Sequence, residues 1–115
     1  MIVRNLHDPE VQGTTYRAHR GGIARMLMTS RFLQGIEFLA HAMLAPGNAL
    51  EEHVDPVEEI YYILKGAGIM QVDGETKHVS EGDAIWIPSG AAHAFTNHLD
   101  EFAEILVIAA YPRVR

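Results

Sequence analysis

Short runs of apolar and β-branched residues alternate with turn residues along most of the chain after position 22. Runs of this length, bounded by glycine, proline and aspartate, predict β-strands rather than helices. We expect strands over these ranges: 23–28, 36–44, 59–64, 69–72, 75–79, 84–87, 92–96 and 105–109. Asp73-Gly74, between two of these ranges, is a strong signal for a tight β-hairpin. Strands at this spacing, with no long helix between them, predict an all-β antiparallel sandwich or barrel.

Two segments fit a helix as well as a strand. The apolar residues of the first, within 48–64, recur at helical spacing: Leu50, Val54, Val57 and Tyr61. Pro56 would interrupt such a helix, and the residues after it are β-branched and aromatic. The second segment, residues 102–109, contains a contiguous apolar run that also suits a buried strand. We favour a strand in both segments, more firmly in the first.

The first 22 residues are the least patterned part of the chain. Residues 9–22 mix glycine, threonine and basic residues without an apolar period, so we expect residues 1–22 to form an N-terminal arm. A length of 115 residues suits one domain and is too short for two, and we assign that domain to residues 23–115. The arm could cross to a second copy of the chain and add a strand there.

Composition narrows the functional classes. With 48% hydrophobic residues the chain can bury a core, which excludes general disorder. Nine basic and fifteen acidic residues give a net charge of −6, which argues against nucleic-acid binding. The absence of cysteine excludes disulfides, iron–sulfur clusters and thiol nucleophiles. No apolar stretch reaches the roughly 20 residues of a membrane span, and the N-terminus lacks a secretory signal, so we expect a cytoplasmic protein that binds no membrane.

Histidine and carboxylate residues carry the candidate chemistry. We assign no role to four of the seven histidines, which lie in polar or loop segments: His7, His19, His78 and His98. His53, Asp55 and Glu59 share parity, so an extended chain would point all three to one face. Buried charges need compensation, and imidazole and carboxylate groups are ligands for Mn²⁺, Fe²⁺, Ni²⁺ or Zn²⁺. A solvated acidic rim is the alternative. His93 follows the turn Pro88-Ser89-Gly90, which could aim its ring inward.

Three further side chains are candidates for the lining of a pocket. Tyr61 shares parity with Glu59, and Phe95 with His93, so regular strands would turn both rings into the barrel. Plain core packing is the alternative for both rings. His41 lies in an apolar run with small neighbours and could reach the same cavity, although a hydrogen-bonded core histidine would fit the run as well. We assign no residue a catalytic role.

Two motifs resemble those of the cupin family. The first is Gly47-x5-His53-x-Asp55-x3-Glu59-x6-Gly66, which is similar to the first cupin motif but has Asp55 where the family usually has its second histidine. The second is Gly82-x5-Pro88-x-Gly90-x2-His93-x3-Asn97, which matches the second cupin motif at every defined position. Two such motifs in order are specific for a fold and much less specific for a function.

The resemblance implies a double-stranded β-helix, a small jelly-roll barrel with one divalent metal in its mouth. Carried over position by position, the ligands would be His53, Glu59 and His93, with Asp55 as a fourth ligand, a ligand through water or a partner of the other ligands. Direct binding by Asp55 favours Mn²⁺ or Fe²⁺, with Ni²⁺ or Zn²⁺ as alternatives. Without it, two histidines and a carboxylate resemble the facial triad of non-haem iron enzymes. A third alternative is a cupin that has lost its metal.

Two functions from different classes follow from the resemblance. One is a metal-dependent enzyme of the dioxygenase, isomerase, decarboxylase or lyase type, acting on a small anionic or oxygen-rich metabolite. The other is a non-catalytic module that binds or senses a small ligand, with or without metal. The strand expected at 59–64 is apolar on both faces, so its outer face needs a cover, and a second copy in a homodimer would provide one.

Overall fold

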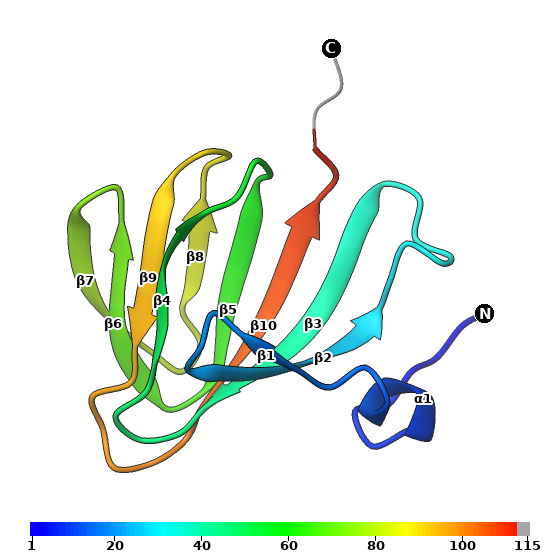
Figure 1. Ribbon diagram of the computed structural model, residues 1–115, viewed down its shortest axis with the longest axis horizontal. Helices are drawn as coiled ribbons and strands as arrows, with labels where there is room; N and C mark the ends of the chain where they lie inside the picture. The colour runs from blue at the N-terminus through cyan, green and yellow to red at the C-terminus, as the bar shows by residue number, and fades with distance from the viewer. Residues whose placement is uncertain (113–115) are drawn as a thin grey trace.

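The computed structural model describes residues 1–112, which are mostly β-structure (Figure 1). A single-turn helix, α1 (Pro9–Gln12), precedes the strands, and no helix in residues 1–112 is long and apolar enough to cross a membrane. The strands are β1 (Tyr16–Ala18), β2 (Gly22–Met28), β3 (Ile36–Leu44), β4 (Ala49–Val54), β5 (Glu59–Lys65), β6 (Ala67–Val72), β7 (Glu75–Ser80), β8 (Ala84–Ile87), β9 (Ala92–Thr96) and β10 (Ala103–Ala110). The all-β prediction is confirmed.

Two antiparallel sheets pack face to face (Figure 1). The larger sheet has the order β1-β2-β3-β10-β5-β8, and the smaller has the order β4-β9-β6-β7. Side chains from both sheets fill one core, and the largest fully buried apolar ones are Phe95, Leu44, Ile63, Ile87 and Ile105. This arrangement is the small jelly-roll barrel that the two motifs imply.

The strands follow the apolar pattern closely. In β5, Tyr61 and Ile63 are buried, whereas Ile60, Tyr62 and Leu64 are exposed, as a strand with one face toward the core requires. Both ambiguous segments contain strands: β4 ends at Val54, before Pro56, and β10 covers the run near the C-terminus. A proline after the strand is compatible with β4, since the missing N–H falls outside the ladder.

The N-terminal segment is more ordered than its unpatterned sequence predicts. It contains α1 and β1, and β1 pairs with β2 of the same chain, with Tyr16 opposite Ala24. The backbone N–H of Met26 also donates to the hydroxyl of Thr14 at 2.8 Å, which extends the contact before β1. A three-residue strand is too short to have a detectable period. Exchange of this segment with a second copy stays a prediction.

Candidate metal site

The candidate site lies between the two sheets, where three strands and a loop meet. His53 lies on β4 and His93 on β9, and the two residues are directly opposite in the ladder after a register shift between Leu50 and His53. Residues opposite one another on paired strands turn their side chains to the same face. Asp55 lies in the loop after β4, and Glu59 begins β5. The fold therefore brings all four predicted ligands to one place.

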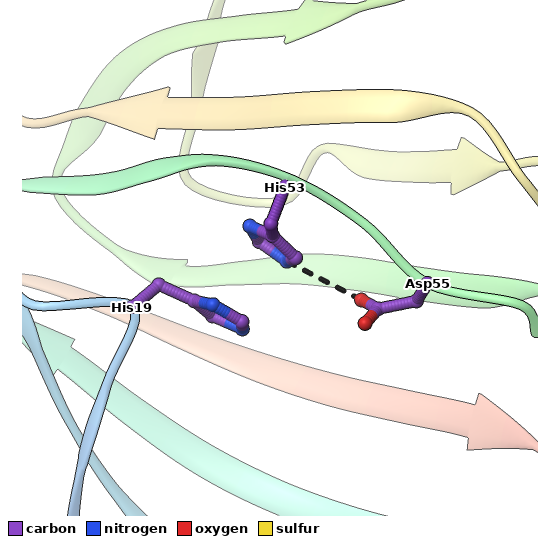
Figure 2. A group of neighbouring side chains, drawn as sticks. All are labelled: His19, His53 and Asp55. Atoms are coloured by element: carbon purple, nitrogen blue, oxygen red, sulfur yellow. Dashed lines mark ion pairs between the residues drawn. The ribbon is translucent and has the colours of Figure 1, made fainter.

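The carboxylate of Asp55 is central to this group. Its Oδ2 atom lies 3.3 Å from Nε2 of His53, the pair joined by the dashed line in Figure 2, and 3.6 Å from Nε2 of His93. Nε2 of His93 lies 3.5 Å from Oε1 of Glu59. Asp55, Glu59 and His93 each offer a donor atom within 4.8 Å of the others, a spacing that one ion can bridge.

Backbone carbonyls set the orientation of both imidazoles. Nδ1 of His53 lies 2.7 Å from the carbonyl oxygen of Glu51, and Nδ1 of His93 lies 2.9 Å from that of Ala91. A carbonyl can only accept, so Nδ1 carries the hydrogen in each ring and Nε2 keeps its lone pair. This is the arrangement that metal-binding histidines commonly have, with the second nitrogen held by a hydrogen bond.

Three of the inward-facing atoms make no hydrogen bond to any of the described residues. They are Nε2 of His53, Nε2 of His93 and Oε1 of Glu59, and all three are buried. Leaving a buried polar atom unpaired costs about 1–3 kcal/mol. Since lone pairs from two imidazoles and a carboxylate face one another, a cation satisfies all three at once, and the donor set suits a divalent metal. The residues present therefore fit such an ion.

Burial controls protonation in the site. Burial, followed by the neighbouring carboxyl group of Asp55, raises the pKa of Glu59 to about 8. Burial also lowers the pKa of His93, and the nearby His53 acts in the same direction. An imidazole that resists protonation, in His93, and a carboxyl group that resists ionisation without a cation, in Glu59, are the pattern expected when nothing else compensates the charge.

A small cavity adjoins the carboxylate of Glu59. Its volume is about 50 Å³, and much of its wall is small or aromatic: Tyr16, Ala18, His19, Ala24, Phe38, Ala40, Ala42, Leu50, Glu59, Tyr61 and Val107. Tyr61 thus lines the cavity, with its hydroxyl pKa raised by burial and by Glu59. Phe95 is fully buried and packs in the core close to Gly68 rather than in the cavity wall.

His41 does not line this cavity. Its neighbours Ala40 and Ala42 do, so alternation along β3 turns His41 to the opposite face of the sheet. There Nε2 of His41 lies 2.8 Å from Oε1 of Glu104, an ion pair if the ring is protonated. The expectation that His41 reaches the pocket is corrected here: the small alanines, not the histidine, face the barrel interior.

A much larger cleft opens elsewhere, between β7 and β8. Its volume is about 620 Å³, and its walls include Val79, Ile85 and Trp86. None of the four predicted ligands lines it. Size alone would favour this cleft as a binding site, but the unpaired donor atoms belong to His53, Glu59 and His93, and of these Glu59 lines the small cavity.

His19 is the site residue that sequence reasoning missed. Its ring stacks on that of His53, with centroids 3.4 Å apart and planes inclined by 9°. Figure 2 shows His19, His53 and Asp55 together, and each offers a donor atom within 4.8 Å of the others. Because position 19 lies outside both motifs, the one local signal was the Gly21-Gly22 pair, which indicates a tight turn after His19.

Comparison with known proteins identifies the family. The cupin domain model matches residues 40–109. An uncharacterised protein of Methanocaldococcus jannaschii, MJ1618, is 38% identical over 85 residues, 71% of this chain and 67% of its own. The oxalate-binding protein of Thermotoga maritima is 27% identical over 111 residues, 94% of this chain and 92% of its own. A crystal structure described as a predicted oxalate decarboxylase from Thermotoga maritima superposes with a TM-score of 0.79, at 27% identity and over 96% and 98% of the two chains.

Other matches have varied enzymatic names and are longer than this chain. They include polyketide synthase proteins, a dimethylsulfoniopropionate lyase and an acireductone dioxygenase, and the matched part covers from 36% to 58% of their lengths. Their variety agrees with a fold that serves many reactions. From the matched residues, the two motifs and the jelly-roll barrel, the chain belongs to the cupin family.

Proposed function

We propose that this cupin holds one divalent transition metal and acts as an enzyme on a small anionic or oxygen-rich metabolite. Its ligands are His53, Asp55, Glu59 and His93. The observation that carries the proposal is the convergence of three buried, unpartnered donor atoms beside the carboxylate of Asp55. Two imidazoles and two carboxylates balance a divalent charge and favour Mn²⁺ or Fe²⁺ over Ni²⁺ or Zn²⁺.

The metal would supply a Lewis acid with open positions for a ligand oxygen. The chain's own residues do the rest of the work. The carbonyl groups of Glu51 and Ala91 hold the two imidazoles in place. The hydroxyl of Tyr61, which lines the cavity beside Glu59, can donate to an oxygen of the bound molecule.

The size of the cavity supports a small ligand. A volume of about 50 Å³ has room for about four water molecules, since each needs roughly 10–15 Å³ of this kind of space. A ligand with few non-hydrogen atoms and two oxygens for the metal fits this description. The relatives named for oxalate support the same class, and oxalate is therefore the first molecule to test.

Metal content is the test of this proposal. Untagged protein is analysed for transition metals beside Glu59→Gln, His93→Ala and a control, His98→Ala, which changes an exposed histidine. We expect about one equivalent of metal in the parent protein and in the control, and a marked loss in both site variants. A parent protein that stays free of metal after incubation with Mn²⁺ or Fe²⁺ would overturn the proposal.

A binding module without catalysis is the second candidate, favoured by the relative named an oxalate-binding protein. Calorimetry of the metal-loaded protein with oxalate measures binding, and the loss of oxalate over time measures turnover. Binding with no consumption under aerobic and anaerobic conditions would identify a binding module. Consumption that disappears in Glu59→Gln would identify an enzyme.

A further inference from the structure

The turn between β1 and β2 has an unusual backbone. His19 and Arg20 both have a positive φ, of 46° and 68°, although neither is glycine. Positive φ is uncommon outside glycine, and such residues concentrate at functional sites. A Cβ atom at Gly21 would overlap the carbonyl oxygen of Ala49, so this turn lies directly against β4. The close approach brings His19 to the metal site.

Several contacts fix the turn to β4. The carbonyl oxygen of His19 accepts hydrogen bonds from the backbone N–H of Gly21 at 2.9 Å and of Glu51 at 3.2 Å. The side chain of Arg20 lies 3.4 Å from a carboxylate oxygen of Glu51, and Arg20 forms a backbone bridge with Leu50. The backbone of His19 is thus held in place, while its side chain is exposed.

The ring nitrogens of His19 are free to bind a ligand. Neither ring nitrogen makes a hydrogen bond within residues 1–112, in contrast to His53 and His93, whose Nδ1 atoms are occupied. A donor atom of His19 lies within 4.8 Å of one on His53 and one on Asp55 (Figure 2). Asp55 belongs both to this group and to the group with Glu59 and His93.

We propose that His19 is a further donor of the metal site, supplied from outside both cupin motifs. The inference rests on the proposed metal site. One ion cannot lie in the planes of both parallel rings, those of His19 and His53, at the same time. His19 therefore binds the ion after its ring has rotated away from the ring of His53. Its exposed side chain permits this rotation, and its fixed backbone keeps the nitrogen near Asp55.

This role for His19 offers a physical explanation for the departure from the family motif at Asp55. The family motif has a histidine at this position, and the carboxylate of Asp55 leaves the site one imidazole short. His19 restores that imidazole from the turn after β1 while Asp55 keeps its negative charge. The resulting set of three imidazoles and two carboxylates accepts Fe²⁺ as well as Mn²⁺, because imidazole suits the later metals.

The test separates donation from stacking. His19→Phe keeps an aromatic ring for the stack but removes the nitrogen, and His19→Asn keeps a residue that tolerates positive φ but removes the ring. His78→Phe, at an exposed position on β7, is the matched control. Each protein is stripped of metal, and its thermal unfolding midpoint is measured. It is then titrated with Mn²⁺ and with Co²⁺, whose visible spectrum reports the coordination of the ion.

We expect both His19 variants to bind Mn²⁺ about tenfold or more weakly than the control, with a changed Co²⁺ spectrum. Unchanged affinity in His19→Phe would overturn the inference and leave His19 as a stacking residue. Weaker binding with an unchanged Co²⁺ spectrum would overturn it as well, since the ring would then act only through His53. A parent protein that binds neither ion would instead overturn the proposed metal site itself.

Discussion

Nε2 of His93 lies 3.5 Å from Oε1 of Glu59, and both atoms are buried with no hydrogen-bond partner among the described residues. The imidazole is neutral because burial lowers its pKa, so it cannot offset the charge of the carboxylate. The folded protein therefore has two ways to relieve the site. It can keep a proton on Glu59, or it can bind a cation there.

The stability of the metal-free protein should fall as pH rises from 6.5 to 8. In this window unfolded Glu59 is ionised, since its ordinary pKa is 4.5, whereas the folded protein with a pKa of about 8 retains the proton. Stability decreases with pH wherever the folded state binds more protons. His19 and His93, whose pKa values are lowered, have their effect below about pH 6.5, where they make the stability rise with pH.

Urea unfolding of chelator-treated protein at several pH values in this window measures the effect. In Glu59→Gln the decrease should be much smaller, because the amide neither ionises nor releases a proton. Saturating Mn²⁺ should also remove the decrease in the parent protein, since the ion replaces the proton. If the stability of the parent and that of Glu59→Gln changed with pH in the same way, Glu59 would not be the cause of the pH dependence.

Asp55→His should change the metal preference of the site. The substitution replaces a carboxylate by the imidazole of the usual family motif, which makes the donor set softer and less negative. We expect affinity for Zn²⁺ and Ni²⁺ relative to Mn²⁺ to rise by about tenfold or more. Competition titrations measure the ratio, with Asp55→Asn as the companion variant that removes the charge without adding an imidazole. A ratio unchanged in both would mean that Asp55 does not touch the metal.

Ala40→Val should block the small ligand without removing the metal. Ala40 is buried and lines the cavity of about 50 Å³, so two added methyl groups would fill much of it. Overpacking of this kind costs about 1–3 kcal/mol of stability. We expect full metal content and a loss of oxalate binding in calorimetry, with Ala84→Val on an exposed position of β8 as the control. Unaltered oxalate affinity in Ala40→Val would place the ligand elsewhere.

The outer face of the larger sheet should form a homodimer interface. Ile60 pairs with Trp86 across β5 and β8, and Tyr62 and Leu64 continue the same exposed face. The side chain of Trp86 is 62% exposed, which excludes a core role for it in one chain. Sedimentation of Ile60→Glu should give a monomer and that of the parent a dimer. Val54→Glu, on the other sheet, should leave the dimer intact, and a monomeric parent would contradict the prediction.

The sequence predicted the candidate ligands from shared parity, from the turn before His93 and from the two motifs. Parity placed His53, Asp55 and Glu59 on one face of an extended chain, but β4 ends at Val54 and Glu59 begins β5 of the other sheet, so the packing of the two sheets brings them together rather than alternation along one strand. The orientation of His41 could not be predicted, because the run around it is apolar on both faces. His19 was missed because its contact with His53 depends on a three-residue strand and a left-handed turn, and neither leaves a periodic pattern. The two motifs thus identified the four candidate ligands and missed the residue that tertiary packing adds.

The position of β10 has a consequence for how the protein forms during synthesis. β10 lies between β3 and β5 and pairs with both, so the larger sheet consists of two unconnected pieces until residues 103–110 are available. His53, Glu59 and His93 all emerge from the ribosome before that strand. The start of β5, with Glu59, pairs with Ile87 of β8 on one side and gains its second neighbour only when Ala109 arrives on the other side. Pairing across such long separations is slow, so metal capture should follow the emergence of the last strand rather than accompany translation of the ligands.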